Sequence, residues 1–142
     1  MGWHQDRTIA VQRRIDVPGF GPWTVKSCAV HVEPPFEITQ RMVTLRVHLD
    51  EVDPDNAPLL IAPGSHGLGR IPTSRITATE ASLGSLPCLA KSGDVWIYST
   101  SILHASDTAT WPRRRRVLQV DWAAEELPGG LQWLGIDNVE SA

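Results

Sequence analysis

The stretch of residues 42–52 constrains the fold most, because its two rows of side chains differ sharply in polarity. On an extended chain alternate residues face opposite sides. The apolar row is Val43, Leu45, Val47 and Leu49, and the polar row is Met42, Thr44, Arg46, His48 and Asp50. A row with this much charge does not suit a dry core. We therefore expect a barrel strand whose polar row faces a wet binding cavity and whose apolar row packs outward against another layer.

The rest of the chain is also typical of short strands. Proline and glycine separate short alternating runs, and these runs predict further strands at residues 8–12, 25–32, 58–62, 94–99 and 115–122. Short helical turns are expected at residues 37–41 and 77–83. The sequence contains no repeat, no linker and no long helix. Residues 1–142 should therefore form a single, mainly β domain built as a barrel or sandwich.

Composition excludes several classes of protein. Hydrophobic residues make up 42% of the chain and charged residues 20%, as in an ordinary globular domain. No apolar run approaches the roughly 20 residues of a membrane span. The net charge of -3 argues against nucleic acid or an anionic membrane as the main partner. A start without an apolar signal segment predicts a cytoplasmic protein, in which Cys28 and Cys88 are reduced thiols.

Two His-X-Asp pairs are candidates for metal binding. His4 and Asp6 lie two residues apart, so on an extended backbone both side chains project to the same side. His48 and Asp50 repeat the pattern inside the predicted central strand, where hydrogen bonding along the cavity wall is the alternative role. Two imidazoles and one carboxylate on one face of Fe(II) leave positions open for a co-substrate and oxygen. A third ligand is thus needed for either pair.

His104 is the candidate third ligand, and Arg115 is its candidate companion. Arg115 stands eleven positions later, at the start of a strand that would run back beside the site. A buried arginine requires an anionic partner, which a co-substrate carboxylate would provide. The run Arg113–Arg116 could alternatively be a solvated strand entrance or a phosphate-binding patch. His66 lies in a turn-forming sequence and is expected to be exposed.

Taken together, these motifs resemble the phytanoyl-CoA dioxygenase family of Fe(II)- and 2-oxoglutarate-dependent oxygenases. The resemblance spans roughly residues 3 to 133 and rests on short segments in the family's order. They are Trp3-His4-Gln5-Asp6, residues 44–50, Asn56-Ala57-Pro58-Leu59, Pro63-Gly64-Ser65-His66, Gly93-Asp94, Leu103-His104-Ala105-Ser106 and Arg115-Arg116-Val117-Leu118.

The resemblance implies a double-stranded β-helix, that is, a jelly-roll or cupin-like barrel. It implies His4, Asp6 and His104 as iron ligands, Arg115 as the anchor of 2-oxoglutarate and Ser106 as a helper at the same carboxylate. The implied reaction is hydroxylation of a small organic substrate by molecular oxygen, with release of succinate and CO2. Candidate pocket residues are Trp3, Trp23, His31 and Arg46.

One departure from the family keeps other interpretations open. Family members carry a long region before the His-X-Asp pair, with helices that back the barrel, whereas here the pair begins at position 4. The chain would then be the C-terminal part of the usual domain. One alternative is a truncated or degenerate barrel that serves as a binding or interaction module without catalysis. Another is a cupin-type metal enzyme that uses His48 and Asp50. The apolar row left without a covering layer also predicts self-association.

Overall fold

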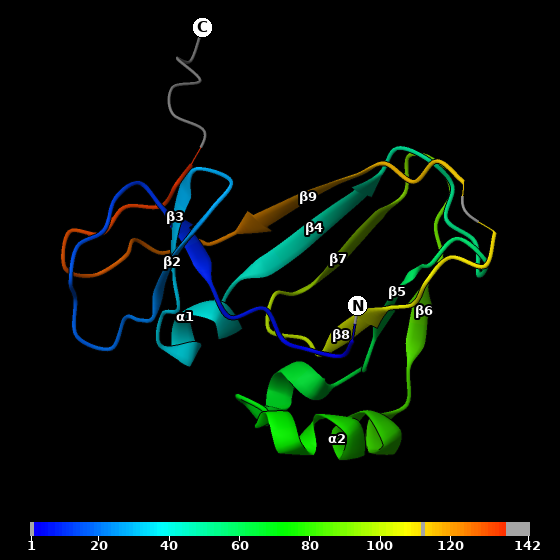
Figure 1. Ribbon diagram of the computed structural model, residues 1–142, viewed down its shortest axis with the longest axis horizontal. Helices are drawn as coiled ribbons and strands as arrows, with labels where there is room; N and C mark the ends of the chain where they lie inside the picture. The colour runs from blue at the N-terminus through cyan, green and yellow to red at the C-terminus, as the bar shows by residue number, and fades with distance from the viewer. Residues whose placement is uncertain (1, 112, 136–142) are drawn as a thin grey trace, which may run out of the picture.

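The computed structural model describes residues 2–111 and 113–135, which fold as three antiparallel sheets with short helices (Figure 1). The strands are β1 (Ile9–Val11), β2 (Trp23–Lys26), β3 (Ala29–Val32), β4 (Val43–His48), β5 (Leu59–Ile61), β6 (Leu86–Cys88), β7 (Val95–Ser99), β8 (His104–Ser106) and β9 (Val117–Trp122). The helices are α1 (Phe36–Gln40) and α2 (Ile76–Leu83), with 3-10 turns at Ser65–Leu68 and Thr73–Arg75. None of the helices among the described residues is long and apolar enough to cross a membrane.

The barrel consists of two sheets that face each other. In one, β4 is the central strand between β7 and β9, and in the other β5 lies between β6 and β8. A buried cluster of Leu59, Ile61, Cys88 and Ile102 joins them, with Trp96 and Tyr98 of β7 packed against it. The third sheet, β1-β3-β2, lies beside this pair (Figure 1). The predicted mainly β architecture is therefore confirmed.

Strand β4 orients its two rows as the alternation predicts. Thr44 and His48 are buried between the sheets, and Arg46 is half-buried beside them. The opposite row joins outward-facing side chains of β7 and β9 in one apolar face. On this face Ile97 is 64% exposed and Trp122 is 62% exposed. The expected covering of this face is not seen among the described residues, so the apolar row faces outward but remains exposed.

The single strand predicted at residues 25–32 is wrong. The structure has a hairpin instead, in which Ser27 and Cys28 form the turn between β2 and β3. Both have left-handed backbone angles, with φ of 47° and 65°. Such tight turns normally use glycine or asparagine, and neither occurs here, so the turn leaves no signal. Strands β6 and β8 were not predicted either, because three residues are too few to show alternation.

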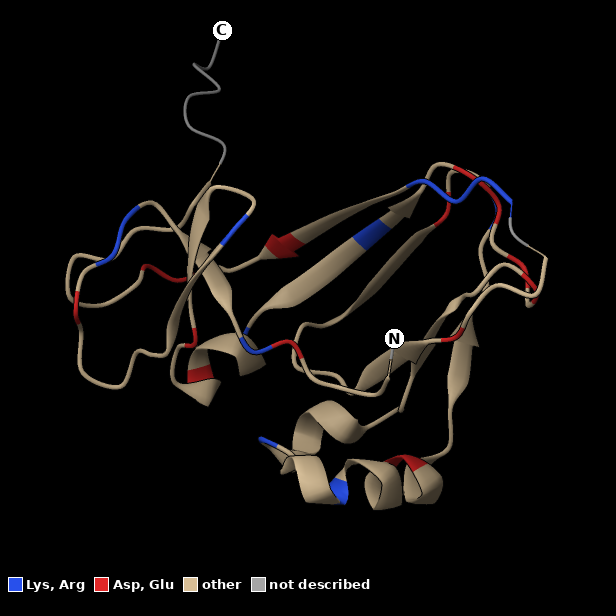
Figure 2. Ribbon diagram, viewed as in Figure 1, with Lys and Arg blue, Asp and Glu red and all other residues tan. Residues whose placement is uncertain are grey.

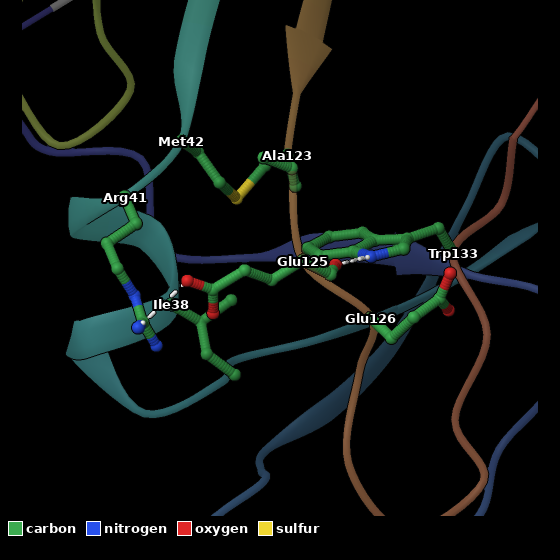
Figure 3. A pocket seen from close by; sticks show the side chains of 8 residues that line it. Ile38, Arg41, Met42, Ala123, Glu125, Glu126 and Trp133 are labelled. Carbon is green, nitrogen blue, oxygen red and sulfur yellow. Dashed lines mark hydrogen bonds and ion pairs between the residues drawn. The ribbon is translucent and has the colours of Figure 1, made fainter.

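The segment after β9 returns to pack on the sheet β1-β3-β2 and on α1 (Figure 3). Trp133 pairs with Val11 of β1, and its indole Nε1 donates a hydrogen bond of 2.8 Å to the carbonyl of Glu125. The Glu125 carboxylate also forms an ion pair of 3.0 Å with Arg41, at the end of α1. These contacts leave a hollow of only about 40 Å³ beside Met42. This region is thus packed support for the barrel.

Candidate metal centre

The chain start is held against strand β8 by backbone hydrogen bonds. The His4 amide donates to the His104 carbonyl, and the His104 amide donates to the His4 carbonyl, both at 2.9 Å. Terminal segments fray unless tied down, and this antiparallel bridge ties His4 directly beside His104. The first and third candidate ligands, 100 positions apart in sequence, are therefore neighbours in space.

Gln5 fixes the direction in which its neighbours point. Its buried side chain donates hydrogen bonds to the carbonyls of Ser101 (2.8 Å) and Gly69 (3.1 Å), and it accepts one from the Ile71 amide (2.9 Å). Because successive side chains of an extended segment face opposite sides, anchoring Gln5 turns His4 and Asp6 to the other side. Sequence analysis missed this role, although a polar residue between two candidate ligands is a usable signal.

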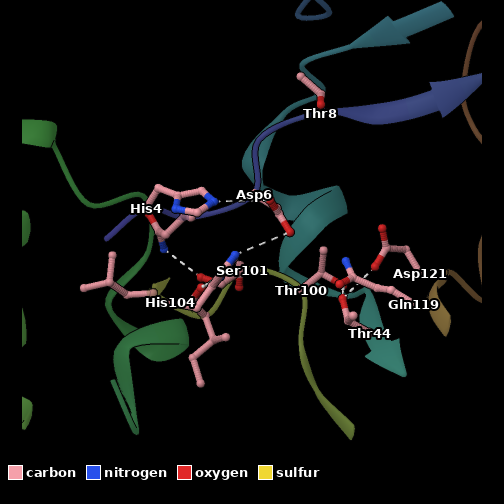
Figure 4. Close-up of polar contacts among 12 residues, drawn as sticks. His4, Asp6, Thr8, Thr44, Thr100, Ser101, His104, Gln119 and Asp121 are labelled. Carbon is pink, nitrogen blue, oxygen red and sulfur yellow. Dashed lines mark hydrogen bonds and ion pairs between the residues drawn. The ribbon is translucent and has the colours of Figure 1, made fainter. Parts of the chain in front are cut away.

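His4, Asp6 and His104 converge in one cluster (Figure 4). Their ligand atoms all lie within 4.8 Å of one another. The Nε2 atom of His4 is 3.9 Å from one carboxylate oxygen of Asp6, and the Nε2 atom of His104 is 3.8 Å from the other. The two imidazole rings are tilted by 56° with centroids 4.4 Å apart. This is the donor set of a site with two histidines and one carboxylate.

Backbone carbonyls determine the tautomer of both histidines. Nδ1 of His4 is 2.8 Å from the Gly2 carbonyl, and Nδ1 of His104 is 2.9 Å from the Ile102 carbonyl. A carbonyl only accepts, so each Nδ1 carries the proton. Each Nε2 then has a free lone pair directed at the cluster. Holding the outer ring nitrogen in this way is how proteins orient metal-binding imidazoles.

Burial keeps His104 neutral. Its side chain is only 7% exposed, and this burial lowers the pKa of His104 below 6.5, an effect that the nearby charges of His4 and Arg46 reinforce. The Ile102 carbonyl and the Asp6 carboxylate oppose the shift without reversing it. A neutral imidazole is the form that binds a metal ion. His104 is therefore in the form that can bind a cation at neutral pH.

The cluster opens into a hollow between the two facing sheets, with a volume of about 340 Å³. Besides the three candidate ligands, its lining consists of Arg46, Leu59, Tyr98, Ser106, Arg115 and Gln119. We refer to it as the inner hollow. Arg115 and Ser106 thus lie at the same hollow as His4, Asp6 and His104. The sequence suggested a buried Arg115, but the residue is exposed. Its guanidinium donates a hydrogen bond to the carbonyl of Ala57.

Comparison with known proteins identifies the family of this chain. The family model described as phytanoyl-CoA dioxygenase matches residues 1–117. The chain belongs to the phytanoyl-CoA dioxygenase family. Comparison with curated proteins gives no match.

Solved structures support the same fold. The structure of EctD from S. alaskensis with bound Fe has a TM-score of 0.54 and 24% identity, over 64% of this chain and 33% of that one. The structure of EctD from S. alaskensis with 2-oxoglutarate and 5-hydroxyectoine has a TM-score of 0.55 and 23% identity, over 64% of this chain and 32% of that one. The structure of EvdMO1 has a TM-score of 0.52 and 24% identity, over 73% of this chain and 23% of that one. The chain thus spans about a third of EctD's length, and the likeness confirms the double-stranded β-helix fold.

The second His-X-Asp pair has a different environment in this family member. His48 is buried, and no hydrogen bond partner lies at either ring nitrogen among the described residues. Asp50 is engaged by Arg116, whose hydrogen bonds to it lower the pKa of the Asp50 carboxyl to about 2. No cluster of three ligands includes either residue in the part of the chain that the structure describes. The geometry therefore favours His4 and Asp6.

The arginine run lies at the end of the barrel, beside acidic loops (Figure 2). Arg113 forms an ion pair with Asp53, and Arg116 pairs with Asp50, with a separation of 2.9 Å from Nη2 to Oδ1. These partners neutralise two of the four positive charges. A dedicated phosphate patch is therefore not supported here, and Arg116 is paired as well as solvated.

The remaining candidate residues are spread over the molecule. Trp3 lines a second hollow on the outer side of the first strand segment, which His4 and Asp6 also border. Arg46 lines the inner hollow. Trp23 instead packs against the buried cluster around Val11 and Val32 of the sheet β1-β3-β2, and Nδ1 of His31 bonds to the Ala29 carbonyl. His66 is exposed, as its turn sequence suggests.

Ser65, next to His66, has a structural role that sequence analysis missed. Its buried hydroxyl accepts a hydrogen bond of 2.8 Å from the Leu103 amide, immediately before His104. Gly64 allows this approach with a left-handed φ of 84°, which glycine adopts without strain. The turn containing these residues therefore fixes the backbone that carries the third candidate ligand.

Proposed function

We propose that this chain is an Fe(II)- and 2-oxoglutarate-dependent dioxygenase that hydroxylates a small organic substrate with release of succinate and CO2. The observation that carries the proposal is the convergence of His4, Asp6 and His104, with both Nε2 atoms free, at the inner hollow. Two imidazoles and one carboxylate form the facial set that suits Fe(II) with open positions. The EctD structures, which hold Fe in one case and 2-oxoglutarate in another, support this assignment.

The residues divide into metal ligands and co-substrate contacts. His4, Asp6 and His104 would hold Fe(II), and Arg115 with Ser106 would bind the distal carboxylate of 2-oxoglutarate through charge-assisted hydrogen bonds. With both bound, the iron supplies the oxidative decarboxylation by molecular oxygen that drives hydroxylation. Burial favours the neutral form of His104, the Gly2 and Ile102 carbonyls fix the orientation of both imidazoles, and the two sheets would enclose the co-substrate.

Anaerobic titration with Fe(II) and 2-oxoglutarate tests the proposal directly. The wild-type chain should develop a visible metal-to-ligand charge-transfer band, because the 2-oxo acid chelates the bound iron. His104→Ala should abolish the band by removing a ligand. Arg115→Gln should leave the band but shift its half-saturation to higher 2-oxoglutarate concentration, by about 10- to 100-fold for a lost charged hydrogen bond.

His66→Ala is a matched control, since it removes an exposed imidazole from a turn. It should leave the band and its half-saturation unchanged. A folded wild-type chain without a band would contradict the proposal and favour the alternative, a barrel that acts as a binding or interaction module. A band that persists in His104→Ala but disappears in His48→Ala would instead assign the metal to the second His-X-Asp pair.

A further inference from the structure

The inner hollow carries more positive charge than its own residues balance. Arg46 and Arg115 line it, and Asp6 is the acidic residue among its described lining. Neither guanidinium forms an ion pair with a carboxylate within residues 2–111 and 113–135. Asp121, on the same face of β9, accepts a hydrogen bond of 2.7 Å from Thr44 instead. Arg46 is half-buried, and an unpaired charge away from water is costly, so this surplus favours an anionic ligand.

Arg46 has hydrogen bond donors to spare. Its Nη1 atom donates to the Gln119 side chain at 2.9 Å, whereas its Nε atom is buried without a partner. A guanidinium carries five N–H donors in a planar fork that matches a carboxylate. Gln119 and the Tyr98 hydroxyl, to which Arg46 also donates, thus hold the side chain in place, and its Nε donor remains for a ligand in the inner hollow.

Arg46 and Arg115 lie toward opposite ends of that hollow. Gln119 is the cross-strand partner of Arg46, and Arg115 lies four residues before it, on the same face. Four residues of extended chain span about 13 Å. On the opposite sheet His104 pairs with Ile61, while Arg115 contacts the carbonyl of Ala57, four residues away from Ile61. Arg115 therefore lies at the end remote from the metal cluster.

We infer that Arg46 binds the carboxylate adjacent to the keto group of 2-oxoglutarate, while Arg115 binds the distal carboxylate. The inference rests on the proposed function. It assigns one guanidinium to each charge of a dicarboxylate that lies along the inner hollow, with its keto end at His4, Asp6 and His104. Arg46 is then a second co-substrate residue, which contacts the part of the molecule that all 2-oxo acids share.

Two probes separate the roles of the two arginines. 2-Oxopentanoate has the same keto acid head as 2-oxoglutarate but a methyl group in place of the distal carboxylate. Dissociation constants of both probes are measured on the anaerobic Fe(II)-loaded chain by calorimetry and by the charge-transfer band. Arg46→Gln should weaken both probes by a similar factor of about 10- to 100-fold. Arg115→Gln should weaken 2-oxoglutarate by that factor and leave 2-oxopentanoate unchanged.

Further variants keep the test decisive. Arg114→Gln removes an exposed charge outside the lining of the inner hollow and should leave both constants unchanged. If Arg46→Gln does not fold, Arg46→Lys is measured instead, and a smaller loss that is equal for both probes is expected. Wild-type-like binding of both probes by the Arg46 variant, or weakening of 2-oxoglutarate alone, would overturn the inference. A wild-type chain that binds neither probe would instead refute the proposed function.

Discussion

Gln5 shows how much one side chain between two ligands determines. Its amide makes three hydrogen bonds to the backbone at Gly69, Ser101 and Ile71, all of them to segments at least 64 residues away in sequence. We predict that Gln5→Ala lowers the free energy of unfolding by about 2–3 kcal/mol, because buried partners lose their hydrogen bonds. It should also weaken Fe(II) binding about 10- to 100-fold, as loss of supporting contacts does at other metal sites.

Chemical denaturation and anaerobic iron titration measure these two effects. Gln12→Ala is the matched control, because Gln12 is exposed and its backbone, not its side chain, bonds to Gln132. The control should change neither quantity. Wild-type iron affinity in a destabilised Gln5→Ala chain would show that the bridge between His4 and His104 positions the ligands without Gln5.

For single residues, the sequence identified the candidate ligands but not the residues that hold them in place. His4, Asp6 and His104 are recognisable because the residue types themselves suggest metal chemistry. Gln5 and Ser65 act through hydrogen bonds to backbone atoms distant in sequence, and no local pattern indicates such partners. The same reason applies to Arg115, whose place beside the site was predicted but whose contact with the Ala57 carbonyl was not.

Among the elements, the apolar outer face of β7, β4 and β9 has the clearest consequence. Its outward side chains include Val95, Ile97, Leu118, Val120 and Trp122, all substantially exposed. Contiguous apolar patches of this kind promote association. We predict that the chain 1–142 self-associates with rising concentration and that Ile97→Lys shifts it toward monomer. Sedimentation velocity over a concentration series measures the change.

The substitution should not disturb the fold, because exposed positions contribute little to stability, and a charge on an edge strand also discourages strand pairing. Val25→Lys serves as the control. Val25 is 72% exposed but lies on β2, in the sheet β1-β3-β2. Its substitution should leave the association unchanged. Equal effects of the two variants, or none from Ile97→Lys, would show that this face is not the associating surface.

The elements also show which features a sequence encodes strongly. The alternation in β4 extends over six strand residues and predicted both the polar inner row and the apolar outer row. Strands β6 and β8 contain three residues each, and they form because β5 offers both of its edges. Pairing of this kind depends on the assembled sheet, so the local sequence does not predict it.

For the molecule as a whole, His48 links stability to pH. It is 1% exposed, and burial, followed by the charge of Arg46, lowers the pKa of His48 below 6.5, while Asp94 opposes the shift. As the pH falls below about 6.5, His48 therefore binds a proton in the unfolded chain but not in the folded chain. The contribution of neutral His48 is fully present above pH 6.5 and is lost as the pH falls below it, at no more than about 1.4 kcal/mol per pH unit.

His48→Leu should remove this part of the acid dependence. Because both ring nitrogens lack partners, the substitution should leave stability at pH 7 unchanged or raise it by about 1 kcal/mol. Urea denaturation of both proteins from pH 5 to pH 8 tests this, with His66→Leu as a control for an exposed imidazole. An unchanged acid slope, together with a loss of stability at pH 7, would show that His48 is hydrogen-bonded in solution.

The backbone bridge between His4 and His104 has a consequence for the timing of synthesis. The two histidines are 100 positions apart in sequence, so the ribosome releases His104 only after strands β1 to β7 have been made. A nascent chain that ends before residue 104 carries the His4–Asp6 pair without the imidazole of His104 opposite it. If His4, Asp6 and His104 are the iron ligands, as proposed, iron can load only after residue 104 has been synthesised, and a chain stalled before that residue would lack one ligand of the site.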